Sequence, residues 1–382
     1  MSESAGQPMR RRAVKITCEV YKSLAPQAEA ALAALRVDSA QVHSRRAIVL
    51  RERALLPFLA PTTRLEEDPA EVYEIYVAPN QARGALRAWA RALQLFTPGR
   101  GTIYAEEVET FDPEGLGSFP LQLAGPDAGD LPDETLSPLS LINCVVQRGR
   151  GNDIARCALE TGTPVPSINF GVGTGVRDRL GLLRIAIPAE KEVVSLIVEA
   201  HEQQALFDAL IDAGRLDQPG RGFIAACPIL LGVPNTRSFR GPQRHRASMD
   251  QLIAAVDQLR AGTAWRRGSG AAGDGAGRTR RGYLRDLVNV TLRCSEGSSE
   301  RVLATALRAG AGGATISRSK LFSPSGKATV AFPGRELVDL SLDPGQLDGL
   351  IRALGDGGAF DAPVACFVET KPLPMAFTYV AG

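Results

Sequence analysis

The chain alternates apolar strand-like stretches with amphipathic helix-like stretches, and it repeats this order three times. Cysteine-bearing apolar stretches open the three units at residues 14–20, 141–147 and 288–294. Each is followed by a helix, two strands, a second helix and a closing strand. Helices are indicated by apolar residues three and four positions apart, and strands by β-branched apolar runs. Repetition on this scale predicts three copies of one structural unit.

The unit boundaries follow from composition. Stretches rich in Pro, Gly and Asp, or in Gly and Arg, separate the periodic regions. The segment 53–70, which holds three prolines, is predicted to be a loop. We expect module 1 at residues 13–111, a linker at 112–138, module 2 at 139–235, a linker with an amphipathic helix and a Gly-rich basic tract at 236–286, and module 3 at 287–380.

The order β-α-β-β-α-β in each unit is the ferredoxin-like arrangement. Two helices then cover one face of a four-stranded sheet, and the other face is expected to be apolar and to need a cover. Three such faces packed together would supply it. The predicted fold class is therefore α+β, with three tandem ferredoxin-like modules packed as an intramolecular pseudo-trimer.

Composition excludes several classes of protein. The chain has 44 basic and 42 acidic residues, a formal net charge of +2 and 44% hydrophobic residues. This balance does not favour a nucleic-acid partner, although the basic tract at 266–281 keeps that alternative open beside a solvated linker. No apolar run is long enough to span a bilayer, and no apolar signal core follows the N-terminus. We expect a cytoplasmic protein.

The cysteines and histidines do not form a recognisable chemical motif. The six cysteines lack the paired spacing of a zinc site, and those in strands are expected to be buried. The three histidines, at 43, 201 and 245, fall in different contexts and are not expected to bind a metal. No nucleophile or general base is positioned by a motif, so we do not expect an enzyme.

The middle unit carries the clearest candidate site. Gly171 and Gly173 lie where the second strand opens into a long loop, and Lys191 begins the third strand. Gly220-Arg221-Gly222 precedes the last strand. Glycines let backbone amides approach an anion closely, and a lysine and a guanidinium add positive charge. Together these residues predict a phosphate-binding cradle.

The middle unit also resembles a known family over nearly its whole length. The stretches QRGRGNDIA, GVGTGVRDRLGLLRIAIPAEKEVVSLIV and LIDAGRLDQPGRGFIAACPI resemble the PII signalling proteins, the nitrogen regulatory PII-like family. The resemblance implies a nucleotide-binding, trimeric signal-transduction protein involved in nitrogen regulation. The outer units match only in pattern.

The resemblance also implies a ligand. No cofactor is required, but an adenine nucleotide (ATP, ADP or AMP) is expected as an effector in the clefts between modules. In module 1 only Arg100 and Gly101 correspond to the site. The implied effector-binding residues are Gly171, Gly173, Lys191, Gly220, Arg221, Gly222, Arg100 and Gly101.

The long loop of the middle unit mixes charged and apolar residues. It either packs on its own module or docks on a partner protein, such as a membrane transporter or a metabolic enzyme. The expected docking residues are Gly175, Arg177, Arg179, Leu180 and Leu182. We therefore expect a monomeric regulator that senses a small effector. The alternative is a structural or adaptor protein that has lost effector binding.

Overall fold

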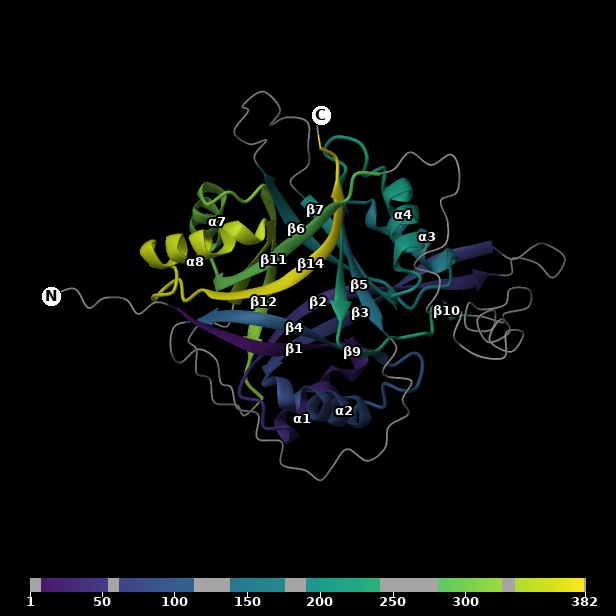
Figure 1. The fold of residues 1–382 in the computed structure, drawn as a ribbon. Helices are drawn as coiled ribbons and strands as arrows, with labels where there is room; N and C mark the ends of the chain where they lie inside the picture. The colour runs from purple at the N-terminus through teal and green to yellow at the C-terminus, as the bar shows by residue number, and fades with distance from the viewer. Residues whose placement is uncertain are drawn as a thin grey trace.

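Strands fill the centre of the molecule and helices lie outside them. In the computed structural model of the chain, residues 8–53, 62–112, 138–175, 190–240, 281–324 and 334–380 are described. Three pairs of helices, α1 with α2, α3 with α4 and α7 with α8, lie at three corners around the strands (Figure 1). No helix of the described residues has the length and apolar character needed to cross a membrane.

The first segment contains the elements that its periodicity predicted, with longer strands. They are β1 (Met9–Tyr21), α1 (Ala25–Ala34), β2 (Ala40–Arg53), β3 (Thr62–Val77), α2 (Ala82–Ala92) and β4 (Gly101–Asp112). The loop predicted at 53–70 is wrong for Arg53 and for residues 62–70, because β3 begins at Thr62 and pairs with β2 as far as Arg53, whereas residues 54–61 lie outside the described residues. The alternating residues of this hairpin extend the pairing despite Pro69, which lies opposite Arg46.

The middle segment has the same order of elements. They are β5 (Leu139–Gln147), α3 (Gly151–Glu160), β6 (Ser167–Gly175), β7 (Glu190–Glu199), α4 (Gln203–Gly214) and β8 (Gly222–Ile229). Two short strands follow, β9 (Leu231–Val233) and β10 (Phe239–Arg240). They pair with β4 and β2, so the middle segment reaches back to the first.

The third segment repeats the order again. It consists of β11 (Leu284–Ser295), α7 (Ser299–Arg308), β12 (Gly313–Phe322), β13 (Gly334–Leu342), α8 (Leu347–Asp356) and β14 (Phe367–Thr378). The predicted linker helix falls within 241–280, outside the described residues, as does most of the linker predicted at 112–138.

All these strands belong to one continuous sheet. Its fourteen strands run in the order β10-β2-β3-β1-β4-β14-β11-β13-β12-β6-β7-β5-β8, with β9 beside β4. Further pairings of β2 with β12 and β6, and of β14 with β8, close the sheet on itself. About half of the residues (49%) lie in strands, and ten strands form a closed antiparallel barrel.

The predicted fold class is therefore wrong. The chain is not three tandem ferredoxin-like modules packed as a pseudo-trimer, because its strands share one closed sheet with few helices. The physical reason lies in the strand edges, whose unpaired backbone groups are satisfied by strands from other segments. Two further expectations depended on that fold. The structure does not support a ferredoxin-like PII pseudo-trimer, and it gives no evidence for nitrogen regulation or nucleotide binding.

The apolar side chains gather between the sheet and the helices. Three separate clusters lie under the three helix pairs, and each includes strand residues and inward helix residues. Trp89 of α2, Phe207 of α4 and Leu350 of α8 are fully buried there. The strand cysteines are buried as predicted, and all six cysteines are free thiols. Packing against the helices thus buries one face of each strand.

Candidate functional site

A large cavity lies on the other face of the strands, inside the closed sheet. It has a volume of about 750 Å³, and residues of twelve strands line it, namely β1 to β8 and β11 to β14. Side chains alternate along each strand, so residues that do not face a helix face this cavity. A cavity of this size is typical of a small-molecule binding site.

The inward face is mixed, because apolar residues such as Leu141, Ala225 and Leu373 line the cavity beside charged ones. In β1, for example, Ile16 and Cys18 belong to the core under the helices, whereas Lys15 lines the cavity. Glu74, Glu106 and Arg293 line it in the same way from β3, β4 and β11. The expectation of an apolar inward face is therefore met only in part, by small apolar clusters that join strands of different segments.

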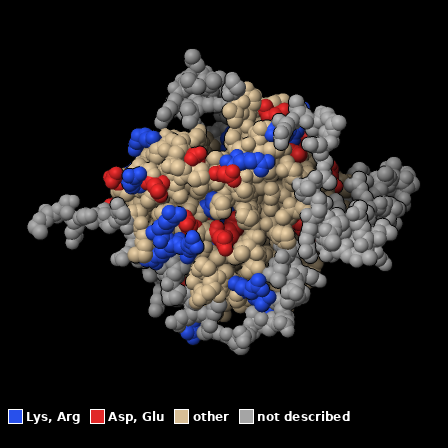
Figure 2. Space-filling view, in the orientation of Figure 1, with Lys and Arg blue, Asp and Glu red and all other residues tan. Residues whose placement is uncertain are grey.

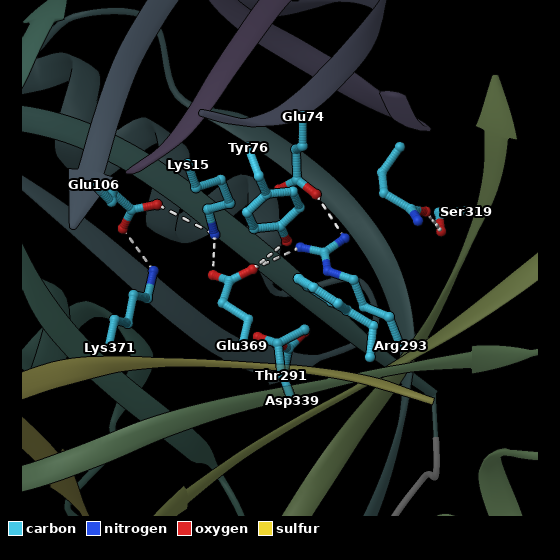
Figure 3. Close-up of polar contacts among 12 residues, drawn as sticks. Lys15, Glu74, Tyr76, Glu106, Thr291, Arg293, Ser319, Asp339, Glu369 and Lys371 are labelled. Carbon is cyan, nitrogen blue, oxygen red and sulfur yellow. Dashed lines mark hydrogen bonds and ion pairs between the residues drawn. The ribbon is translucent and has the colours of Figure 1, made fainter. Parts of the chain in front are cut away.

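Charged residues at the inner end of the cavity form one chain of ion pairs (Figure 3). Lys371 lies 2.6 Å from Glu106, and Lys15 lies 3.3 Å from Glu106 and 2.5 Å from Glu369. Arg293 continues the chain, at 3.1 Å from Glu369 and 2.8 Å from Glu74. The chain holds three cations and three anions, so its formal charge is zero.

The charges in this chain stabilise one another although they are buried. Burial raises the pKa of Glu369, but Lys15 and Arg293 outweigh it and lower that pKa to about 2. The pKa of Glu74 is lowered in the same way, against its burial, by Arg293 and Lys15. Tyr76 adds a hydrogen bond from its hydroxyl to Glu369 at 2.5 Å. Paired charges of this kind hold strands in register, although Nε of Arg293 has no hydrogen-bond partner among the described residues.

The other end of the cavity contains most of the residues that the sequence predicted. Gly173, Lys191, Gly220 and Gly222 all line it. They come from the end of β6, the start of β7 and the turn before β8. Val172, which also lines the cavity, is 45% exposed, so this end lies nearest to solvent. We call Gly173, Lys191, Gly220 and Gly222 the mouth cluster.

Lys191 is the charged member of the mouth cluster. Its ammonium group has no ion-pair or hydrogen-bond partner among the residues that the structure describes. Partial burial lowers the pKa of Lys191. A cation that has lost part of its hydration without gaining a partner favours binding of an anion.

The glycines of β6 are needed for close packing. A Cβ on Gly173 would lie 2.7 Å from Cε of Lys191, so the lysine side chain crosses the backbone there. A Cβ on Gly171 would lie 2.7 Å from the Thr315 side chain of β12. Gly171 is not among the cavity-lining residues. Gly173 therefore belongs to the candidate site, and Gly171 serves the contact between β6 and β12.

Gly222 and Gly101 occupy equivalent places in their strands. A Cβ on Gly222 would lie 2.1 Å from the carbonyl oxygen of Val145, and one on Gly101 2.3 Å from that of Glu19. Both glycines also have a positive φ, which disfavours other residues. Both are thus required by the strand pairing, and only Gly222 lines the cavity.

The two predicted arginines do not join the mouth cluster. Arg100 donates a hydrogen bond from Nε to the carbonyl oxygen of Leu93 at 2.7 Å, at the end of α2. Arg221 donates from Nε to Gln218 at 3.3 Å within its own turn. Neither residue lines the cavity.

The predicted docking loop is largely outside the described residues. Only Gly175 is described, as the last residue of β6, where it pairs with Gly313 of β12. Arg177, Arg179, Leu180 and Leu182 lie within 176–189. The mouth cluster sits where β6 and β7 lead into this segment.

Sequence reasoning missed several cavity residues. Periodicity alone does not distinguish the ion-pair residues from other strand residues, although a lone charge between apolar neighbours, as in Lys15 or Arg293, indicates a charged side chain on the inward face. His43 and Asn169 also line the cavity. Nothing in the sequence sets these two apart. Among the described residues, no group of three His, Cys, Asp or Glu side chains could hold a metal ion.

Charged groups on the outer surface are mixed. On the face shown in Figure 2, basic and acidic side chains lie near one another and do not form separate areas. The exposed surface in this view thus does not point to a strongly charged partner. The cavity remains the candidate site.

Comparison with known proteins does not identify a family. No protein-family model matches the chain, and no curated protein matches it. The resemblance to PII proteins therefore stays a prediction. A solved structure with low similarity is described as "The crystal structure of pregilvocarcin in complex with GilR, an oxidoreductase that catalyzes the terminal step of gilvocarcin biosynthesis".

The alignment with that oxidoreductase has a TM-score of 0.16 and 12% sequence identity, and it covers 82% of this chain. The chain spans 55% of the length of the oxidoreductase. A likeness at this level is no basis for a shared fold or activity.

Proposed function

We propose that the protein is a non-enzymatic regulator that binds a small organic phosphate at the mouth cluster. The observation that carries the proposal is the unpaired, partly buried ammonium group of Lys191 beside Gly173. Five cations line the cavity, and the other four, Lys15, Arg45, Arg293 and Lys371, lie within 3.5 Å of a carboxylate oxygen. Among the described residues that line the cavity, Lys191 is thus the cation without an acidic partner and is available to a ligand.

The surroundings of Lys191 suit a phosphate group. Gly173, Gly220 and Gly222 line the same end of the cavity. Because glycine has no side chain, an anion can approach its backbone closely. The resemblance of the middle segment to PII proteins suggests adenine nucleotides, which are therefore the first ligands to test.

The position of the mouth cluster supports a regulatory role. β6 ends at Gly175 and β7 begins at Glu190, so a ligand at Lys191 would bear on both ends of the segment 176–189. A ligand changes a conformational equilibrium only if it binds one state more tightly. We propose that this segment contacts a regulated protein, with a membrane transporter as one candidate class, and that the protein acts in the cytoplasm. Free thiols at all six cysteines favour such a reducing compartment.

Calorimetric titration of the full chain tests the proposal. The ligands are ATP, ADP, AMP, cyclic AMP and ribose 5-phosphate, each also titrated into Lys191→Met. We expect saturable binding of at least one ligand, weakened about tenfold or more in the variant, because a charge-assisted hydrogen bond is lost. No saturable heat with any of the five ligands contradicts the proposal.

A structural or adaptor role is the second candidate. The neutral chain of ion pairs from Lys371 to Glu74 favours it, since each charged group in that chain already has an oppositely charged partner without a ligand. An adaptor would retain its partners when Lys191 is replaced. Pull-down experiments with wild type and Lys191→Met, with and without the ligands above, separate the two roles.

A further inference from the structure

Two neutral side chains deeper in the cavity carry polar atoms without partners. Nδ1 of His43 and Oδ1 of Asn169 are both shielded from solvent, and neither has a hydrogen-bond partner in the described part of the chain. Both residues line the cavity. A buried polar atom without a partner costs free energy, so such atoms mark a place where a ligand or water completes the bonding.

The contacts of His43 determine which atom carries its proton. Arg45 donates from Nε to Nε2 of His43 at 3.2 Å. A guanidinium group can only donate, so Nε2 accepts and the proton of the neutral ring is on Nδ1. Burial, with the charge of Arg45, lowers the pKa of His43 to about 3, so the ring is neutral near pH 7. His43 therefore carries an unpaired hydrogen-bond donor and Asn169 an unpaired acceptor, and both residues line the cavity.

Strand pairing brings these two residues to the same region. Arg46 of β2 lies opposite Ile168 of β6, so the next step along the antiparallel pair sets Arg45 beside Asn169. His43 is two residues further along β2, on the same face as Arg45. The donor and the acceptor thus belong to neighbouring strands.

The same pairing relates Asn169 to the mouth cluster. Lys191 lies opposite Gly171, and Asn169 is the next residue along β6 on that face. Diagonal neighbours of this kind have side chains about 7–8 Å apart at their bases. A ligand of moderate size that reaches Lys191 can therefore also reach Asn169.

We propose that the cavity recognises a bifunctional ligand, whose phosphate binds at Lys191 and whose neutral amide-like or nitrogen-heterocyclic group bonds with His43 and Asn169. This inference rests on the proposed phosphate site at the mouth cluster. The neutral group must both accept a hydrogen bond, from Nδ1–H of His43, and donate one, to Oδ1 of Asn169. An aliphatic group does neither, and a second phosphate cannot donate to Asn169 when it is fully ionised.

The ligand itself provides the first test, which needs no variant. AMP carries a phosphate and a heterocycle with donors and acceptors, whereas ribose 5-phosphate carries the same phosphate without the heterocycle. We expect the full chain to bind AMP about tenfold more tightly or better, since two hydrogen bonds to otherwise unpaired groups contribute at least this much. Equal affinities would overturn the inference and indicate that water occupies this region.

Variants then assign the selectivity to the two residues. In His43→Leu and Asn169→Leu, the ratio of AMP affinity to ribose 5-phosphate affinity should fall towards one, while ribose 5-phosphate binding is retained. Matched controls are His201→Leu and Asn152→Leu, which change the same residue types outside the cavity lining. Thermal unfolding verifies that each variant is folded. An unchanged ratio in both cavity variants would overturn the inference.

The outcomes for the two proposals are distinct. Binding of ribose 5-phosphate without preference for AMP supports the phosphate site and overturns the bifunctional ligand. Absence of binding by both probes overturns both. If a cavity variant does not fold, the imidazole nitrogen signals of His43 in the wild type provide the readout. They should shift with AMP and not with ribose 5-phosphate, and the reverse would count against the inference.

Discussion

The ammonium group of Lys15 lies 2.5 Å from a carboxylate oxygen of Glu369, although 354 positions separate the two residues. Lys15 comes from β1 and Glu369 from β14. Both side chains are almost fully buried, at 7% and 1% exposure. Two strands from opposite parts of the chain are thus tied together inside the closed sheet by an ion pair that is almost fully buried.

Replacing Glu369 by Gln should lower the free energy of unfolding by about 3–5 kcal/mol, because Lys15 and Arg293 would each lose a buried anionic partner. Urea titration measures the change. The matched control is Glu109→Gln, which removes a pair with Arg10 whose side chains are 30% and 58% exposed. That change should cost less than about 1 kcal/mol. Equal effects in the two variants would contradict a stabilising role for the buried chain.

Stability should fall as the pH is lowered below about 6.5, and His43 is the cause in the upper part of this range. Its pKa is about 3 in the folded protein against 6.5 ordinarily, so the unfolded chain takes up the proton first. The contribution of neutral His43 to the free energy of unfolding is complete above pH 6.5, and it is lost as the pH falls towards 3. Glu369, with its pKa lowered from 4.5 to about 2, adds a loss only below pH 4.5.

Urea titrations from pH 7 to pH 4.5 verify this assignment. His43→Gln should have a flatter stability profile over that range than the wild type. A wild-type slope in His43→Gln would exclude His43 as the titrating group.

Lys191 and Arg221 should differ in their importance for ligand binding. Lys191 lines the cavity, whereas Arg221 bonds Gln218 in its own turn. We expect Lys191→Met to weaken binding of AMP about tenfold or more, and Arg221→Met to change it by less than about twofold. Calorimetry of the two variants under one salt concentration measures both. If Arg221→Met weakened AMP binding more than Lys191→Met, Arg221 would belong to the binding site, as the sequence predicted.

Gly222 should not tolerate a side chain. Its Cβ would lie 2.1 Å from the carbonyl oxygen of Val145, so Gly222→Ala must distort the pairing of β8 with β5. We expect a loss of about 2–4 kcal/mol in the free energy of unfolding. Gly349→Ala is the control, because Gly349 lies in α8 with open space around it. This helix change should stabilise by about 0.5–1 kcal/mol, and a destabilisation as large as that of Gly222→Ala would contradict the argument.

Periodicity predicted the local elements of this chain well, because each strand and helix carries its own apolar face. Ile16 and Cys18 in β1, or Leu86 and Trp89 in α2, are spaced for burial against a helix or a sheet. The pairing of β14 with β8 was not predictable in this way. Edge pairing depends on backbone groups that every residue carries, so the sequence does not encode it in side-chain types.

The candidate site could likewise be predicted only in part from the sequence. Gly173, Lys191, Gly220 and Gly222 could be predicted because glycine and lysine at these places form a recognisable pattern. Arg100 and Arg221 satisfied the same pattern, but local hydrogen bonds hold them away from the cavity. His43 and Asn169 could not be found, since only the closed sheet brings β2 beside β6.

The position of β14 has a consequence for how the molecule folds. This strand pairs with β11 of its own segment, with β4 of the first segment and with β8 of the middle segment. Closure of the sheet therefore requires contacts between residues hundreds of positions apart, whose loop-closure entropy must be overcome before the contacts form. We expect folding to be slow, with ring closure by β14 as the late step. Until that step, Lys15 and Glu106 would face water, so the charged interior would also keep the open intermediate soluble.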